Sequence, residues 1–191
     1  MDRLSRVLMV TAAWPPVARV GVRRPLRLAR RLPMHGWQPV VLTPTPECIF
    51  RRMPALDESL SVPEVEVLRV PATIPSTRIA RGLTRLPHPL ARPFQRLLED
   101  ALLPDQYPEW TGAAVSAARQ LCGIDVVWVT GGPFGIFRAG SRVAEELAVP
   151  LVLDYRDPWS VAMKPRRAPW APSKARIERM EASILEKAAG V

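Results

Sequence analysis

Short apolar runs alternate with longer amphipathic stretches along most of this chain. Arg6 to Thr11 and Pro39 to Thr43 are runs of mostly aliphatic residues, which is typical of strands buried on both faces of a parallel sheet. Between them, apolar residues recur at helical spacing from Val22 to Leu32, and arginines take the other sides. Gly36 follows, where a glycine commonly ends a helix. The pattern predicts a strand, a helix and a second strand in sequence.

The same alternation returns in the second half of the chain. Strands alternating with helices predict an α/β fold, with a doubly wound, mostly parallel, Rossmann-like sheet and helices on both faces. Gly190 follows the last predicted helix, and Val191 has the character of a strand residue, so the alternation is expected to continue past this point. The further strands are predicted at Val65–Val70, Ile124–Thr130 and Pro150–Tyr155, and the further helices at Trp110–Leu121, after Pro133 and after Ser173.

One stretch interrupts the alternation. Prolines are dense between about residues 71 and 108, so helices there must be short, with Phe94–Leu103 the best candidate. The pattern predicts a Pro-rich irregular insertion within one domain that spans residues 1–191. A chain of 191 residues is long enough to bury a full core and lies in the usual size range of a single domain.

Composition narrows the class of protein. The chain is 48% hydrophobic and 24% charged, as expected of a folded globular protein, and no apolar run approaches the roughly 20 residues that cross a bilayer. The apolar run near the N-terminus leads into a basic helix rather than a cleavage site, which argues against a signal peptide. Cys48 and Cys122 form no disulfide framework, so a cytoplasmic location is expected.

The chain is strongly basic. Its net charge of +9 and isoelectric point near 10.9 favour anionic partners such as phosphates, acidic lipid headgroups or nucleic acid. The alternative is a solvated, arginine-rich surface with no specific partner. Nucleic acid is not expected as a partner, because the tryptophans lie in turns and strands rather than interleaved with the basic residues.

The loops after the predicted strands are the places where chemistry is expected, because ligands of open parallel sheets bind beyond the carboxyl ends of the strands. Gly21 precedes a helix whose first turn carries Arg23 and Arg24, and together they offer backbone N–H groups and guanidinium groups to a phosphate. The alternative is a glycine needed for a tight turn and arginines in solvent.

Two further loops complete this predicted rim. Thr130, Gly131 and Gly132 follow the fourth strand, where the glycines either let the backbone approach a ligand or only form a sharp turn. Arg156-Asp157-Pro158-Trp159 follows the fifth, and a charged pair beside Trp159 is either functional or a structural ion pair.

Nicotinamide-binding, Walker-type nucleotide-binding and metal sites are disfavoured. The first loop lacks G-x-G-x-x-G, the second strand ends in Thr43-Pro44 without an acidic residue, and there is no Walker loop. His35 and His88 have no nucleophile or metal-ligand partners at telling spacing, so no metal site is supported.

Taken in order, these motifs resemble the N-terminal domain of family 4 glycosyltransferases of the two-lobed GT-B type. The resemblance covers essentially the whole chain. It is carried by Trp14-Pro15-Pro16, Gly21, Arg23-Arg24-Pro25-Leu26, His35-Gly36-Trp37, Asp125-Val126-Val127, Thr130-Gly131-Gly132-Pro133 and Pro150-Leu151-Val152-Leu153-Asp154-Tyr155-Arg156-Asp157-Pro158-Trp159.

The resemblance implies a retaining, hexosyltransferase-like enzyme. It would move a sugar from a nucleotide-diphosphate donor to a glycan or lipid-linked acceptor, with the donor as substrate and no cofactor or metal. This lobe would receive the acceptor, and the loop with Gly21 would approach the donor phosphates. The C-terminal lobe, which carries most nucleotide contacts, is absent from these residues, so the domain alone is expected to be a poor catalyst.

The sequence departs from the family pattern at two positions. Arg156 stands where many members have a histidine, and a single Gly21 stands where many have two glycines. The predicted catalytic residues are Arg156, which would contact a phosphate or sugar hydroxyl or orient its neighbour, and Asp157, which would be a hydrogen-bond acceptor or a base for the acceptor hydroxyl. The predicted substrate-binding residues are Gly21, Arg23, Arg24, Thr130, Gly131, Gly132 and Trp159.

Two other classes stay open. The chain could be a non-catalytic module that binds a sugar or a partner protein, or a basic domain that docks on anionic membrane at the inner face of the cell membrane.

Overall fold

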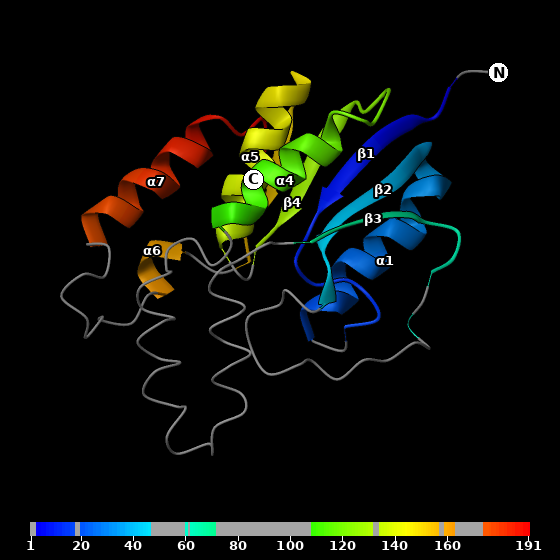
Figure 1. Ribbon diagram of the computed structural model, residues 1–191, viewed down its shortest axis with the longest axis horizontal. Coiled ribbons are helices and arrows are strands. Elements are labelled where there is room, and N and C mark those ends of the chain that lie inside the picture. The colour runs from blue at the N-terminus through cyan, green and yellow to red at the C-terminus, as the bar shows by residue number, and fades with distance from the viewer. Residues whose placement is uncertain are drawn as a thin grey trace, which may run out of the picture.

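The computed structural model describes residues 3–17, 20–46, 60, 62–71, 108–131, 134–156, 159–162 and 174–191. Its centre is a five-stranded sheet in which every strand pair is parallel, with helices on both faces (Figure 1). This is an α/β, Rossmann-like fold, as the alternation of strands and helices predicts. The strands are β1 (Ser5–Val10), β2 (Trp37–Pro44), β3 (Glu66–Val70), β4 (Val126–Thr130) and β5 (Leu151–Asp154).

The order of the strands is β3-β2-β1-β4-β5. β1 lies in the middle, where Leu8 faces Val40 of β2 on one side and Val127 of β4 on the other. The chain proceeds outward in one direction from β1 to β3 and then restarts on the other side with β4. The reversal between β1 and β4 is the topological switch point, beyond which ligands of open α/β sheets bind.

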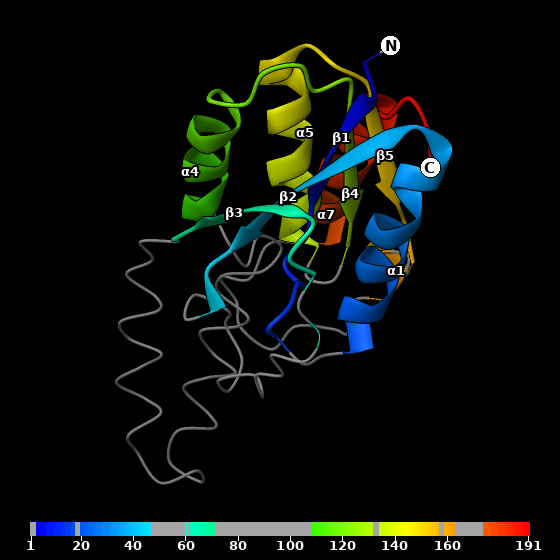
Figure 2. The same ribbon diagram turned by 90° about the vertical axis from the view of Figure 1, so that its right-hand side faces the viewer.

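Helices cover the two faces unequally. In Figure 2, α4 and α5 lie on one side of the sheet and α1 lies on the other. α7 packs with α5, because Ile177 and Ile184 join the same buried cluster as Ile136. The helical elements are η1 (Val20–Val22), α1 (Arg23–Arg31), η2 (Leu32–His35), α4 (Pro108–Ala118), α5 (Gly135–Leu147), α6 (Trp159–Ala162) and α7 (Lys174–Glu186).

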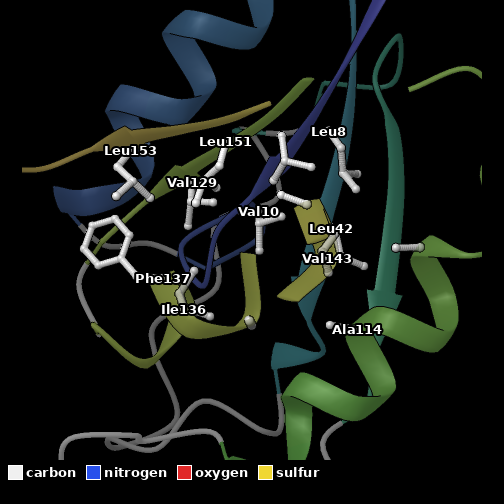
Figure 3. Close-up of a cluster of buried hydrophobic side chains, with 14 of the residues drawn as sticks. Leu8, Val10, Leu42, Ala114, Val129, Ile136, Phe137, Val143, Leu151 and Leu153 are labelled. Carbon is white, nitrogen blue, oxygen red and sulfur yellow. The ribbon is translucent and has the colours of Figure 1, made fainter. Parts of the chain in front are cut away.

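The larger core lies between the sheet and the helices α4, α5 and α7. Figure 3 shows Leu8, Val129 and Ile136 among its side chains, and all three are fully buried. Gly140 lets α5 approach β4 closely, because a Cβ atom at this position would lie 2.2 Å from Cγ2 of Val129. The space between α5 and β4 at this position is therefore too small for one added carbon atom.

A smaller core lies under α1. Leu26 and Ala29 of this helix pack on Met9 of β1 and Val41 of β2. The remaining positions of α1 are mainly arginines exposed to solvent. α1 is therefore the amphipathic helix that the spacing of Val22 to Leu32 predicts.

Most of the predicted bounds hold to within a few residues, and the differences have local causes. The first helix ends at Arg31 and passes into the 3-10 turn η2, since Pro33 has no N–H to continue it. Gly36 then ends this turn with φ 79°. Strand β4 starts at Val126 rather than Ile124, because Asp125 turns its carboxylate onto the backbone N–H of Arg6, 2.7 Å away.

The predictions for the ends of the described segments have mixed outcomes. Gly190 forms an isolated parallel bridge with Val152 of β5, while Val191 is not part of a strand, so the expected continuation of the alternation stays a prediction. Helix α4 begins at Pro108, at the end of the predicted insertion. Residues 72–107, the candidate helix Phe94–Leu103 and the Ser173 cap lie outside the described residues.

Candidate functional site

Three loops meet at the carboxyl ends of the strands. They follow β1, β4 and β5, the strands on both sides of the switch point. The first loop folds back onto the sheet, with Trp14 and Val17 buried and Arg69 of β3 donating to the carbonyl oxygen of Pro15. The Pro15–Pro16 peptide bond in this loop is cis. The loop therefore has a defined position against β2 and β3, and η1 and α1 follow it.

Arg156 connects all three loops. Its Nη2 donates to the carbonyl oxygen of Gly131, after β4. Its guanidinium also lies against Gly21, where a Cβ atom would be 3.6 Å from Nη1 and 3.8 Å from Nη2. Gly21, Gly131 and Arg156 are thus brought together, as predicted. The guanidinium lies at the switch point, where it adds positive charge near the start of α1.

A buried carboxylate lies beside this cluster. Asp154 ends β5, its side chain is 7% exposed, and its Oδ1 lies 2.5 Å from Nη2 of Arg24. Its Oδ2 accepts a hydrogen bond of 2.8 Å from the Thr130 hydroxyl. Both carboxylate oxygens have partners, which offsets the cost of burying a charge. The start of α1 is therefore tied to the end of β5 across the switch point.

Asp154 is the site residue that the sequence analysis missed. In the sequence it lies in an apolar strand and in the run that carries the family resemblance, and neither of these assigns a role to its carboxylate. Two other features point to such a role. A carboxylate at the end of a buried strand needs a partner, and the neighbouring strand ends in the hydroxyl residue Thr130. Recognising the pair required the knowledge that β4 and β5 are adjacent.

Stacked aromatic rings lie beneath the loops. Phe134 stacks on Trp159 with ring centroids 5.5 Å apart, and Phe137 stacks on Tyr155 at 5.1 Å. The ring of Phe137 also lies where a side chain at Gly131 would be, with its Cε2 atom 2.4 Å from an added Cβ. Gly131 therefore has a packing reason to be glycine, in addition to the two reasons considered from the sequence.

Trp159 belongs to the core rather than to the rim. Its side chain is 1% exposed. The carboxylate of Glu181 in α7 holds the backbone here, accepting from the N–H groups of Trp159 and Ser160 at 3.0 Å each. A buried acidic side chain at the start of a helix satisfies N–H groups that have no intrahelical partner. In the structure, Trp159 anchors the segment that follows β5.

The other predicted residues occupy different positions. Thr130 is buried and donates to Asp154, so its hydroxyl does not face solvent. Arg24 is 63% exposed while it pairs with Asp154, and Arg23 is exposed beside it. Gly132 and Asp157 lie outside the described residues.

The charge of the rim is positive. α1 continues from the 3-10 turn η1 and has no acidic residue in its first turn and no side chain that caps its N-terminus, so the partial positive charge of the helix dipole at this end is not neutralised there. Arg23, Arg24 and Arg156 lie around this helix start, and the carboxylate of Asp154 faces Arg24. A helix N-terminal end with guanidinium groups around it suits an anionic ligand such as a phosphate.

A hollow of about 240 Å³ lies elsewhere. It is lined by Ala148, Val149, Leu151 and the ion pair of Glu145 with Lys187, at the amino end of β5. Its walls are mostly backbone and aliphatic groups, so it offers little chemistry, and the rim at the opposite end of the strands is the stronger candidate site.

The described part of the chain contains no group of three or more His, Cys, Asp or Glu side chains that could hold a metal ion. No helix within it is both long and apolar enough to traverse a bilayer. Comparison of the chain with protein-family models and with curated proteins finds no match. The domain is an α/β, Rossmann-like domain, and the rim is its candidate functional site.

Proposed function

We propose that this domain is the acceptor-side lobe of a retaining, two-lobed glycosyltransferase that uses a nucleotide-diphosphate sugar as donor. The observation that carries the proposal is the contact of Arg156 with both Gly21 and Gly131 at the switch point. A guanidinium, a glycine and a helix start lie together where α/β sheets bind ligands. Phosphates of a sugar donor fit such a site.

The described residues suggest a division of roles. The guanidinium of Arg156 and the N–H groups at the start of α1 would face the donor phosphates. Asp154 would act as a positioning residue, since its contacts with Thr130 and Arg24 fix the start of α1 relative to β4 and β5. Asp157, one residue beyond Arg156, would accept the proton of the acceptor hydroxyl. The donor's nucleoside would be held by the second lobe.

A binding experiment on this chain tests the site. Backbone amide resonances would be followed by NMR during titration with pyrophosphate and with a nucleoside diphosphate. We expect weak binding that moves the resonances of Gly21, Gly131 and the start of α1. Arg156→Gln should weaken this binding. The matched control is Arg119→Gln, which removes an arginine that directly follows α4 and pairs with Glu146 of α5, and it should leave binding unchanged. Shifts confined to other surfaces would contradict the site.

A turnover experiment on the two-lobed enzyme tests the reaction. Arg156→Ala and Asp157→Asn should each cut turnover strongly while the melting temperature changes little. If these residues only pin the loops, the same changes should lower the melting temperature and leave the turnover of the folded fraction intact. That second outcome would remove both residues from the active site.

A further inference from the structure

The positive charge of this protein is concentrated in one part of the chain. Residues 3–46 contain eight of the 27 basic residues, all arginines, and none of the 18 acidic ones. The rest of the chain, with nineteen basic and eighteen acidic residues, is nearly neutral. Arginines also occur elsewhere in the chain, but there acidic residues balance them, so the net positive charge is local to residues 3–46.

The helix α1 carries much of this charge on its outer surface. Arg23, Arg27 and Arg30 recur at helical spacing, Arg31 lies next to them, and all four are exposed. None of the four has a hydrogen-bond or ion-pair partner among the residues that the structure describes. Like charges four residues apart destabilise a helix. The helix therefore presents a repulsive cluster that an external anion would neutralise.

Exposed apolar side chains lie at one end of the same surface. Met34 follows α1 in η2 and is 81% exposed, and Leu4 precedes β1 and is 51% exposed. The two are at the same end of the sheet, because the Ser5 N–H donates to the carbonyl of Gly36 at 3.2 Å. Solvent-facing arginines next to exposed aliphatic side chains are the composition of a surface that lies on a membrane interface.

We propose that the exposed side of α1, with Met34 and Leu4 at its end, docks this protein on a bilayer that contains anionic lipids. The arginines would pair with lipid phosphates, and Met34 and Leu4 would enter the headgroup region. Figure 2 shows α1 lying along the outside of the sheet, so a broad surface can meet its length. Duplex nucleic acid fits less well, since the exposed side chains of Met34 and Leu4 have no apolar region to enter on a phosphate backbone, whereas they have one in a bilayer interface. The proposal is independent of the proposed reaction.

Vesicle flotation with the full 191-residue chain tests it. The probes are vesicles of phosphatidylcholine alone and of phosphatidylcholine with about one-third phosphatidylglycerol. We expect binding only to the anionic vesicles, and release as salt is raised to about 0.5 M, where the Debye length is only a few ångströms. Equal binding to both kinds of vesicle would overturn the proposal.

Two matched variants locate the surface. The triple variant Arg27→Gln, Arg30→Gln and Arg31→Gln should weaken binding by about 100-fold, since each arginine near an anionic surface contributes on the order of 1 kcal/mol. The control variant removes the same amount of charge from exposed positions of α7, by Lys174→Gln, Arg176→Gln and Arg179→Gln together. It should change binding little. Unchanged melting temperatures would show that both variants fold. An equal loss in both, or no loss in the first, would overturn the proposal.

Two further measurements separate a bilayer from other anions. Met34→Ser with Leu4→Ser should reduce vesicle binding without changing its dependence on salt. A duplex DNA should bind more weakly than the anionic vesicles at the same ionic strength and should fail to displace them. Tighter binding to the duplex, or full binding by the Met34 and Leu4 variant, would assign the basic surface to a different partner.

Discussion

The helices on one side of the sheet carry their charges in pairs, whereas the helix on the other side carries charges of one sign. Beside α4 and α5, Arg119 lies 2.7 Å from Glu146, and Glu145 lies within 2.8 Å of both Arg142 and Lys187. On α1, Arg27 has no such partner among the described residues. Paired charges neutralise one another locally, so the face with α4 and α5 attracts distant anions only weakly. The arginines of α1 that are unpaired within the described part of the chain give the other face a strong positive potential.

Packing differs between the two faces as well. α5 is pressed against β4 at Gly140, with three aliphatic atoms of Val129 inside contact distance of an added Cβ atom. α1 covers its face with few large side chains, chiefly Leu26. The comparison teaches that one face contributes more of the stability while the other is free to present charge. Experiments on stability should therefore respond to the first face more than to the second.

The largest effect is expected from Gly140→Ala. The added methyl group would meet Val129, a stiff, fully buried side chain. Overpacking costs about 1–3 kcal/mol, offset in part by the better helix propensity of alanine, so we expect a loss of about 2 kcal/mol. Chemical denaturation measures it. The double variant Gly140→Ala with Val129→Ala should lose less stability than the sum of the two single variants, by about 1 kcal/mol.

Gly112 provides the control for this experiment. It lies in α4, and nothing is within 4 Å of the Cβ atom that alanine would add. Gly112→Ala is expected to stabilise the protein by about 0.5–1 kcal/mol, because it lowers the entropy of the unfolded chain and favours the helix. If Gly140→Ala were stabilising to the same extent, the close packing of α5 on β4 would not be a constraint.

A smaller effect, with opposite signs on the two faces, is expected from single charge removals. Arg27→Gln removes repulsion with Arg23 and Arg31 and should raise stability by about 0.3–0.5 kcal/mol. Arg119→Gln breaks the exposed pair with Glu146 and should lower stability slightly. Thermal unfolding at low and high salt measures both changes, and salt should shrink each of them. The same sign for both variants would mean that the two faces are electrostatically alike.

The smallest effect concerns the pH dependence of stability. Hydrogen bonds from Lys187 and then Arg142 lower the pKa of Glu145 below its usual value. A carboxylate with a lowered pKa stabilises the fold above its unfolded pKa, and this contribution is lost as the pH falls through the folded pKa. Because Glu145 is 36% exposed, solvent screening keeps the contribution small.

The variant Lys187→Gln tests this pH dependence. It should raise the pKa of Glu145 toward its ordinary value, measured by carboxyl NMR titration. Its small loss of stability at neutral pH should vanish in strong acid, where Glu145 is protonated with or without its partner. A loss that persists in strong acid would come from packing of the lysine stem rather than from the ion pair.

Much of the fold was predictable because it depends on local pattern. The aliphatic runs identify β1 and β5 without ambiguity, and the spacing of Leu26 and Ala29 identifies the buried side of α1. Convergence of Gly21, Gly131 and Arg156 was also predictable, since the carboxyl ends of parallel strands share one edge. None of these inferences requires knowledge of which strands are neighbours.

The rest depended on contacts between distant residues. The pair of Arg24 with Asp154 joins positions far apart in sequence, and it depends on the strand order that places β4 and then β5 beside β1. The burial of Trp159 depends on Glu181 in α7, a contact with no sequence signal at either residue. Local patterns limit the possible strand orders, whereas packing of the whole chain selects one of them.

The bridge between Gly190 and Val152 bears on how the protein avoids self-association. β5 is an edge strand of aliphatic residues, and an unpaired edge of this kind is a template for the strands of another molecule. The Ala189 N–H donates to the carbonyl of Leu151 at 2.7 Å, and the Gly190 carbonyl accepts from the Leu153 N–H at 2.9 Å. The chain thus covers its own reactive edge. At the opposite edge of the sheet, as far as the structure describes the chain, Glu66 and Arg69 give β3 charged side chains that discourage the same pairing.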